Sequence, residues 1–241
     1  MYRSLTIAAI APVLDERQRI GTVVRRVPRD VVDWLLVVDD GSRDGSGEVA
    51  SEHGATVLRH ARRAGVGAAI RTGFGAALAH GADVVVVMAG NDKDSPEEIP
   101  ALVEPIAAGR ADFVQGSRYL GAPRALGDMP LHRRLGTRLH PWLFSRVARR
   151  AVTESTNGFR AIHRRVLEDP RLDLARRWLD GYDLEPYLYL RAIQLGYRTA
   201  EVPVTKVYAP RAEGRHTKMR PLLDWWPMLR PLVLVGLGIR R

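Results

Sequence analysis

The sequence predicts one α/β domain in which a mostly parallel central sheet carries helices on both faces. Continuous apolar runs of strand length alternate with segments of helical period through the first half of the chain. Turn-forming polar residues and glycines follow these runs, as they do where parallel strands end at a ligand site. With 241 residues, of which 46% are hydrophobic, the chain is long enough to enclose one large core.

The elements expected in the first half are named here in chain order. Buried strands are predicted where apolar residues are continuous, at Leu5–Ala11, Trp34–Val38, Thr56–Arg59, Asp83–Ala89 and Asp112–Gln115. Helices are predicted between them, at Ile20–Val27, Gly45–His53, Gly65–His80 and Ile99–Ala108. The last of these helices is expected to start at a capping box, because Glu98 comes three residues after Ser95.

The pattern loosens beyond about Arg118. Later elements are predicted as helices at Leu131–Val152 and Tyr182–Leu195, a strand at Tyr197–Val207 and a basic loop at Arg211–Arg220. We expect a main domain over residues 1–220 and an amphipathic segment over 221–241. Because this last segment mixes aromatic, aliphatic and basic residues, it either lies in a membrane interface or packs on the domain or in a homodimer.

Composition narrows the function classes. The chain has no cysteine, which excludes disulfides and thiolate metal sites. Its net charge of +10 suits phosphate-rich ligands, nucleic acid or an anionic membrane, or reflects only a genomic preference for arginine. Nucleic acid is not an expected partner, because the sequence has no motif in which basic and aromatic residues read a strand.

The sequence gives no sign of a spanning or targeting segment. No apolar run reaches the roughly 18–20 residues that a membrane-spanning helix needs. The first run is interrupted by Pro12 and lacks a small-residue cleavage site. We therefore expect a cytoplasmic protein, peripheral at the inner face of the membrane if its last segment binds lipid.

Polar residues and glycines follow the predicted strands and meet at one edge of the sheet. A carboxylate there can accept hydrogen bonds from a base or from ribose hydroxyls, glycines let a ligand approach the backbone, and arginine can neutralise a diphosphate. Each group alone is more often a turn, but together on one rim they predict a nucleotide site. The groups are Asp15-Glu16, Asp39-Asp40-Gly41-Ser42, Ala64-Gly65-Val66-Gly67, Gly90-Asn91-Asp92-Lys93-Asp94 and Gly116-Ser117-Arg118.

Several of these groups belong to longer motifs. The motifs are Ala11-Pro12-Val13-Leu14-Asp15-Glu16, Val37-Val38-Asp39-Asp40-Gly41-Ser42, Gly65-Val66-Gly67-Ala68-Ala69-Ile70-Arg71-Thr72-Gly73-Phe74, Gln115-Gly116-Ser117-Arg118-Tyr119, Thr156-Asn157-Gly158-Phe159-Arg160 and Gly181-Tyr182-Asp183-Leu184-Glu185. With these motifs in this order, the chain resembles a family 2 glycosyltransferase of the GT-A fold over about residues 5–220. The resemblance is nearest to the dolichyl- and polyprenyl-phosphate sugar synthases, although the family's opening motif has Asn in place of Asp15.

The resemblance implies a site for a nucleoside-diphosphate sugar, with UDP and GDP both open. The residues it implies in nucleotide binding are Pro12, Asp15, Glu16, Asp39, Asp40, Gly65, Gly67 and Arg71. Those it implies at the donor diphosphate are Asn91, Lys93, Arg118, Arg211 and Lys218. Because the family inverts the anomeric carbon, the acceptor attacks opposite the leaving diphosphate, whose developing charge needs a metal or fixed cations.

Catalytic roles are implied for Asp183, Glu185 and Arg160, with Asp183 as the preferred catalytic position. The acceptor is either a polyprenyl phosphate or a sugar hydroxyl. One of the two acids would act as general base on a hydroxyl, whereas a phosphate is already anionic and needs no base. In the structural alternative, Arg160 only pairs with a carboxylate.

The sequence departs from the family after its fourth predicted strand. Family members carry Asp-x-Asp there, and its second carboxylate binds a divalent cation; this chain has Ala89-Gly90-Asn91. Either the loop shifts to use Asp92 and Asp94, or Asn91 and Asp94 hold a weaker ion, or Lys93 replaces the metal. We expect a weakened Mg²⁺ or Mn²⁺ site on Asn91, Asp92 and Asp94. In the structural alternative, Asp92 and Asp94 only cap the following helix. The loss of Asp-x-Asp also leaves open a protein that binds nucleotide sugars without catalysis.

Overall fold

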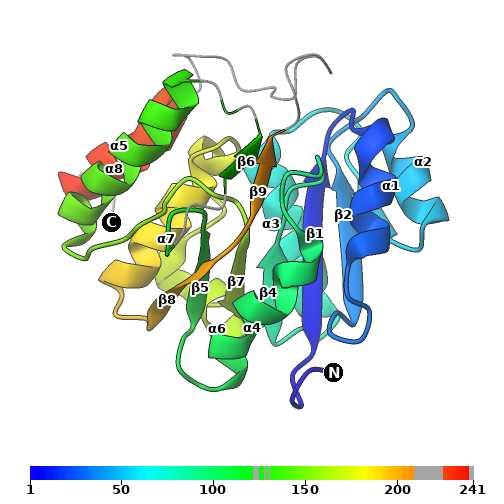
Figure 1. Ribbon diagram of the computed structural model, residues 1–241, viewed down its shortest axis with the longest axis horizontal. Helices are drawn as coiled ribbons and strands as arrows, with labels where there is room; N and C mark the ends of the chain where they lie inside the picture. Colours follow the sequence, from blue (N-terminus) through cyan, green and yellow to red (C-terminus); the bar gives the residue numbers. More distant parts are fainter. Residues whose placement is uncertain (122–124, 128, 130, 209–224, 239–241) are drawn as a thin grey trace.

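The computed structural model describes residues 1–121, 125–127, 129, 131–208 and 225–238. Its centre is a seven-stranded sheet in the order β3-β2-β1-β4-β7-β5-β8 (Figure 1). In chain order these strands are β1 (Ile7–Val13), β2 (Trp34–Asp39), β3 (Thr56–Arg59), β4 (Val84–Val87), β5 (Phe113–Ser117), β7 (Arg160–His163) and β8 (Thr199–Pro203). A second sheet pairs β6 (Ala125–Gly127) with β9 (Lys206–Tyr208).

Helices cover both faces of the central sheet, which explains why its strands read as continuous apolar runs. On one face lie α1 (Arg17–Arg26), α2 (Ser46–Glu52) and α4 (Ile99–Ala107). On the other lie α3 (Val66–Ala79), α5 (Leu131–Ala148), α7 (Leu184–Gln194) and α8 (Trp225–Gly236). Along β1, Ala9 faces the first group and Ile10 the second. The predicted α/β class, with a mostly parallel sheet between helices, is confirmed.

Strand β7 was missed by the sequence analysis. It lies between β4 and β5 and runs antiparallel to both, with Arg160 paired to Val87 on one side and to Gln115 on the other. It is only four residues long and begins with a charged residue, so its sequence gives little strand signal. Its direction matters, because it places the preceding segment 153–159 at the carboxyl ends of the neighbouring parallel strands.

The strand predicted at Tyr197–Val207 is two strands. β8 pairs with β5 in the central sheet, and the chain leaves that sheet after Pro203. β9 then pairs with β6, while Lys206 forms a backbone bridge to Asp94 in the loop that follows β4. This bridge holds β9 next to the loop after β4, at the edge of the sheet where the nucleotide site is predicted.

The capping box predicted at Ser95 and Glu98 was wrong. The Ser95 side chain makes no cap hydrogen bond, and a 3₁₀ turn (Pro96–Glu98) precedes α4. The Glu98 carboxylate instead accepts hydrogen bonds from the backbone N–H and the hydroxyl of Thr205, at 2.7 and 2.8 Å. A partner far along the sequence has taken the group that would otherwise cap the helix.

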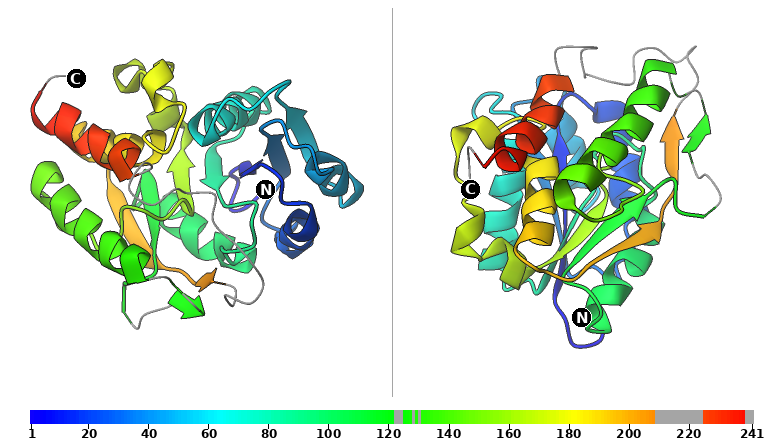
Figure 2. Two further views of the ribbon diagram at one scale, coloured as in Figure 1. Left: turned by 90° about the horizontal axis from the view of Figure 1, so that it is seen from above. Right: turned by 90° about the vertical axis from the view of Figure 1, so that its left-hand side faces the viewer.

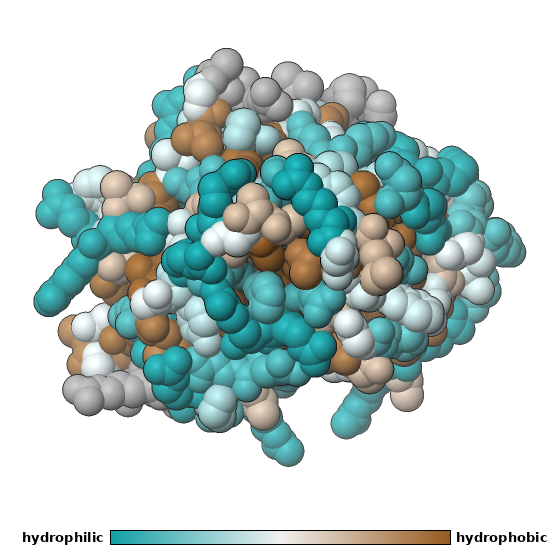
Figure 3. Space-filling view, turned by 90° about the horizontal axis from the view of Figure 1, so that it is seen from below, coloured by the Kyte–Doolittle hydropathy of each residue, from teal (hydrophilic) through white to brown (hydrophobic). Residues whose placement is uncertain are grey.

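Helices α5 and α8 stand side by side at one end of the molecule (Figure 2). The described part of the C-terminal segment is thus a helix, and its Leu232 and Val235 belong to the core that α3 and α7 share. Across the described ranges, no helix is both long and apolar enough to cross a membrane. The face at the amino ends of the parallel strands is mostly covered by hydrophilic side chains (Figure 3).

Candidate functional site

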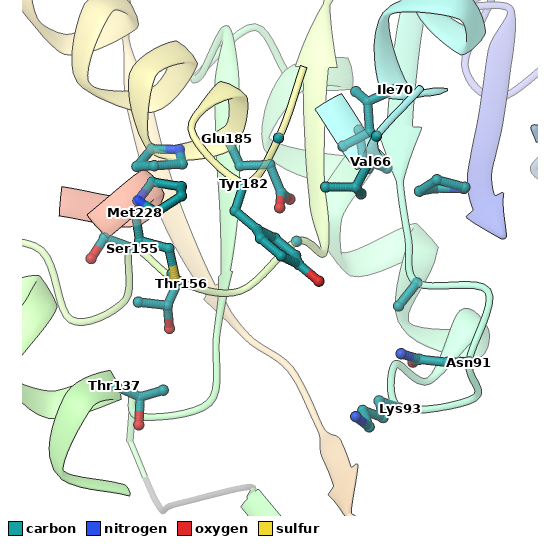
Figure 4. A pocket seen from close by; sticks show the side chains of 18 of the residues that line it. Val66, Ile70, Asn91, Lys93, Thr137, Ser155, Thr156, Tyr182, Glu185 and Met228 are labelled. Atoms are coloured by element: carbon teal, nitrogen blue, oxygen red, sulfur yellow. The ribbon is translucent and has the colours of Figure 1, made fainter. Parts of the chain in front are cut away.

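A cavity of about 550 Å³ opens at the carboxyl ends of the parallel strands. Asn91 and Lys93 lie on one side of it, Ser155, Thr156 and Met228 on the other, with Tyr182 and Glu185 between them (Figure 4). Eight of the residues predicted at the site are in the described lining: Pro12, Glu16, Asp40, Gly65, Asn91, Lys93, Arg118 and Glu185. Arg211 and Lys218, predicted at the diphosphate, lie outside the described residues.

Asp40, directly after β2, shapes the wall of the cavity where the nucleotide site is predicted. Its Oδ1 accepts hydrogen bonds from the Ala64 N–H at 2.7 Å and from His60 Nδ1 at 2.8 Å. Its Oδ2 accepts one from the Gly65 N–H at 2.9 Å. A carboxylate has about four acceptor positions, so one remains for a ligand in the cavity that Asp40 lines.

Asp39 and Asp15 hold the neighbouring turn in shape. The fully buried Asp39 accepts hydrogen bonds from the Ser42 N–H at 2.8 Å and from Arg59 Nε at 3.2 Å. Asp15 has a left-handed backbone, φ +47°, and accepts from the Arg43 N–H at 2.9 Å. Neither is in the described lining of the cavity, whereas Glu16, one residue on, is.

The glycine-rich start of α3 approaches protein backbone more closely than it approaches the cavity. A Cβ on Gly65 would overlap the Asp180 carbonyl oxygen, and one on Gly67 would overlap that of Leu179. The Gly67 N–H donates to the Asp180 carbonyl at 2.8 Å, and Arg71 pairs with the Asp180 carboxylate. The glycines therefore join the start of α3 to the segment that carries Tyr182 and Glu185.

Arg160 holds Glu185 in place. It is fully buried and donates to the Glu185 carbonyl at 2.9 Å and to Glu185 Oε1 at 3.2 Å. It also donates to the carbonyls of Asn157 and Gly158, at 2.6 and 3.2 Å. Arg160 is not in the described lining, while the Glu185 that it orients is.

Asp183 faces α8 instead. Its Oδ1 accepts a hydrogen bond from Arg230 Nε at 2.7 Å, and Arg230 also donates to the Trp178 carbonyl at 2.7 Å. Burial raises the pKa of the Asp183 carboxyl above its ordinary value, and the Arg230 guanidinium opposes this. Of the two acids predicted to be catalytic, Glu185 is the one among the described residues that line the cavity.

Arg118 lies in the cavity wall with its charge already paired. Its Nε donates to Glu154 at 2.6 Å, and its other nitrogens donate to the Tyr208 hydroxyl at 2.5 Å and to Thr156 Oγ1 at 3.2 Å. Glu154 holds its own place by accepting from the N–H groups of Ser155 and Thr156. This buried pair makes the segment before β7 part of the site.

The residues expected to bind a metal are held by other partners. Asp92 pairs with Arg26 of α1 at 2.7 Å. Asp94 Oδ2 accepts from the Ala89 N–H at 2.8 Å, and its Oδ1 lies 2.5 Å from the ammonium of Lys206. The backbone bridge between Asp94 and Lys206 fixes this register, so the loop does not shift to present its acids.

These side chains do not fit a divalent cation. Of these three residues only Asn91 is in the described lining of the cavity, and its Oδ1 is buried with no donor among the described residues. Within the same ranges, no group of three His, Asp or Glu side chains could hold a metal ion without oxygens from a substrate. The weakened metal site expected on Asn91, Asp92 and Asp94 stays a prediction that these contacts do not favour, because Arg26 and Lys206 pair with its two carboxylates.

Sequence reasoning missed Lys206, which lines the cavity from β9. Its ammonium donates to Asp94 at 2.5 Å and to Asn157 Oδ1 at 3.0 Å. Nothing in its own neighbourhood in the sequence marks it, since it lies at the end of an ordinary strand pattern. Its partners belong to two distant motifs, so only the fold shows its place.

The far end of the cavity is apolar and lies between α5 and α8. Its lining there is mainly Leu139, Leu143, Trp225, Pro227, Met228 and Leu229. The side chain of His140 in α5 connects the two helices, because its Nε2 donates to the Met228 carbonyl of α8 at 3.1 Å. Its Nδ1 must then be the acceptor for the Ser155 hydroxyl, at 2.7 Å. Burial lowers the pKa of His140, which favours this neutral form.

The fold and parts of the sequence are found in known proteins. A crystal structure of glucosyl-3-phosphoglycerate synthase from Mycobacterium tuberculosis, in complex with phosphoglyceric acid, matches with a TM-score of 0.70 and 25% identity over 99% of this chain and 82% of that one. The same enzyme with Mn²⁺, UDP and its product matches with a TM-score of 0.71 at 24% identity, covering the same shares of the two chains. These matches confirm the predicted GT-A fold.

Relatives in sequence include lipid-phosphate sugar transferases. Polyprenol monophosphomannose synthase of Mycolicibacterium smegmatis is 33% identical over 203 residues, 81% of this chain and 75% of that protein. Undecaprenyl-phosphate mannosyltransferase of Micrococcus luteus is 30% identical over 221 residues, 88% of this chain and 87% of that protein. The family model described as glycosyl transferase family 2 matches residues 9–169. This chain therefore belongs to glycosyltransferase family 2.

Proposed function

We propose that this glycosyltransferase moves a sugar from a nucleoside-diphosphate sugar to a polyprenyl phosphate, with inversion at the anomeric carbon. The observation that carries the proposal is the shape of the cavity. One continuous space joins the polar wall around Asp40 and Gly65 to the apolar space between α5 and α8. A nucleotide suits the first half, and the hydrocarbon chain of a lipid suits the second.

The reaction between these halves is a single displacement. An oxygen of the acceptor phosphate forms a bond to the anomeric carbon while the bond from that carbon to the diphosphate oxygen breaks. The nucleoside diphosphate leaves with the electron pair, and no proton is transferred. Glu185, held by Arg160, then serves to orient the hydroxyls of the donor sugar, because an anionic nucleophile needs no general base.

Two relatives support a lipid-phosphate acceptor. One is named as a synthase of polyprenol monophosphomannose, and the other as an undecaprenyl-phosphate mannosyltransferase. The match extends over most of each protein. The names also specify mannose, but neither donor sugar nor base follows from the cavity lining. UDP and GDP remain the two donors to compare.

The outer face of α5 supports work at a membrane surface. Leu135, Leu139 and Trp142 are 62%, 52% and 54% exposed and follow one another at helical spacing. Arg134 and Arg138 lie exposed on the same helix, and Arg146 stacks over the Trp142 ring at 5.0 Å. Apolar side chains flanked by arginines suit the interface of an anionic bilayer, where a lipid acceptor is found. We propose that this exposed face of α5 binds the membrane surface.

A transfer assay tests the proposed reaction. The purified protein is given UDP- or GDP-linked sugars together with a polyprenyl phosphate in detergent, and the glycolipid is separated and identified by mass. We expect product with one donor base, and none from the Asp40→Ala variant, which loses three hydrogen bonds that shape the nucleotide wall. Transfer only to a free sugar would replace the lipid acceptor, and donor binding without any product would make the protein a nucleotide-sugar-binding protein.

A further inference from the structure

The loop after β4 is held against β9 by contacts that involve two lysines. Its Asp94 is paired with an ammonium group and not available as a metal ligand. Lys206 Nζ lies 2.5 Å from Asp94 Oδ1 and 3.0 Å from Asn157 Oδ1, and the pair is buried. The Val207 N–H donates to the Lys93 carbonyl at 2.8 Å. β9 and the loop are thus bound by backbone and side chain together, and both lysines line the cavity.

Lysine is rare in this protein. Only three of its 37 basic residues are lysines, at positions 93, 206 and 218, and the other basic residues are arginines. A general preference for arginine therefore does not explain two lysines at one site. An ammonium is a compact charge with three donors, so it resembles a small cation more closely than a planar guanidinium does.

The charge balance of the loop also argues against a resident cation. Asp94 is neutralised by Lys206, and Asp92 by Arg26, which leaves the neutral Asn91 in the cavity wall with Lys93. A divalent ion would have to displace a buried ammonium from Asp94 or lie close to it, and either is unfavourable. An anionic ligand meets the opposite situation, since Lys206 has three N–H donors and its two protein acceptors use two of them.

We propose that Lys206, together with Lys93, takes the place of the divalent cation and binds the donor diphosphate without metal. This inference rests on the proposed function, because it assigns the donor of that reaction to these two side chains. Asp94 and Asn157 are positioning residues that hold the Lys206 ammonium toward the cavity. The charge that develops on the leaving diphosphate would then be stabilised by fixed ammonium groups.

The test measures the affinity for UDP and for GDP by calorimetry, in Mn²⁺ and in EDTA. For the wild type we expect the affinity in EDTA to stay within about twofold of that in Mn²⁺. Lys206→Met and Lys93→Met should each weaken binding about tenfold or more in both conditions, the loss typical of a hydrogen bond to a charged group. Arg26→Met is the matched control: it removes a positive charge that pairs with the same loop through Asp92 and Glu97, and should leave the affinity unchanged.

Because Lys206→Met leaves Asp94 buried and unpaired, the double variant Asp94→Asn with Lys206→Met is measured too, with its folding checked by circular dichroism. It should fold and still bind weakly. A wild-type affinity that falls more than about tenfold in EDTA would overturn the inference and leave the proposed function standing. Lysine variants that bind as the wild type does would also overturn it. A wild type that binds neither nucleotide in either condition would overturn the proposed function, and the inference with it.

Discussion

At the scale of single residues, the site depends on which partner each charge has found. Asp40 and Asp94 both follow apolar strands, but Asp40 accepts from backbone N–H groups and Asp94 is bound by a lysine. Glu185 and Asp183 lie two residues apart, yet Arg160 holds the first at the cavity and Arg230 holds the second against α8. The same residue type therefore has different chemistry according to its partner.

The role of Glu185 can be tested by Glu185→Gln. Because the proposed acceptor is anionic, we expect kcat for transfer to a polyprenyl phosphate to fall by no more than about tenfold, with a weaker affinity for the donor sugar. Steady-state kinetics across pH 6–9 gives both values. A general base would contribute about 10²- to 10⁴-fold, so a loss of that size with a pH-dependent limb would assign Glu185 as the base and favour a hydroxyl acceptor.

Such partners set the limit of prediction from the sequence at this scale. The motifs placed Pro12, Glu16, Asp40 and Gly65 at one edge of the sheet, where strand ends meet, and all four line one cavity. Their role in nucleotide binding stays a prediction. The motifs gave no means of predicting that Lys206 pairs with Asp94, since the two residues lie 112 positions apart. The expected metal site was predicted without knowledge of these pairs, which leave neither Asp92 nor Asp94 unpaired.

At the scale of elements, strong local patterns were predicted and weak ones were not. β1, β2 and β4 are buried on both faces, so their apolar runs identify them. β7 is short and depends on pairing with β4 and β5, which are distant in sequence. The break between β8 and β9 likewise follows from the Asp94 bridge and not from residues 203–205 alone.

The join between α3 and the segment 179–181 gives a prediction with a control in the same helix. Gly67→Ala places a Cβ against the Leu179 and Gly181 carbonyl oxygens, so we expect a loss of about 1–3 kcal/mol in the free energy of unfolding. Gly75→Ala lies in the same helix, and its Cβ meets nothing within 4 Å. It should gain about 0.5–1 kcal/mol, the usual difference between alanine and glycine in a helix. Urea denaturation of both variants measures the free energy of unfolding. If it rises for both variants, Gly67 does not need to be glycine to approach the carbonyl oxygens of Leu179 and Gly181.

The contact between α5 and α8 predicts a dependence on pH. The pKa of His140 is lowered in the folded protein, while in the unfolded chain it is about 6.5. Below that pH the unfolded state binds more protons than the folded state, so this group makes stability fall as the pH falls. The melting temperature of the wild type should drop more between pH 7.5 and 5.5 than that of His140→Gln. His163, whose pKa is also lowered, is present in both proteins and cancels. Equal drops would show that His140 is not the group responsible.

At the scale of the whole molecule, charge and apolar surface are distributed unevenly. The polar part of the cavity around Asp40 lies at the ends of the parallel strands, and its apolar part opens between α5 and α8. These two helices stand side by side at one end of the molecule (Figure 2). The exposed apolar face of α5 lies beside that opening, while the face at the amino ends of the strands is mostly hydrophilic (Figure 3). This arrangement would let a lipid acceptor reach the site from a membrane while its nucleotide donor arrives from water.

Flotation with liposomes tests this arrangement. The wild type should float with vesicles that contain anionic phospholipid at low salt and less so at high salt, because arginines contribute to binding. A variant with serine at Leu135 and Trp142 should lose most of this binding, since these side chains are more than half exposed and lie outside the described lining of the cavity. Trp34→Ser is the control, because Trp34 is an exposed tryptophan at the amino end of β2, away from the opening, and it should float as the wild type does. If this double variant floats like the wild type, the face of α5 does not bind the membrane, and the lipid must reach the cavity by another surface.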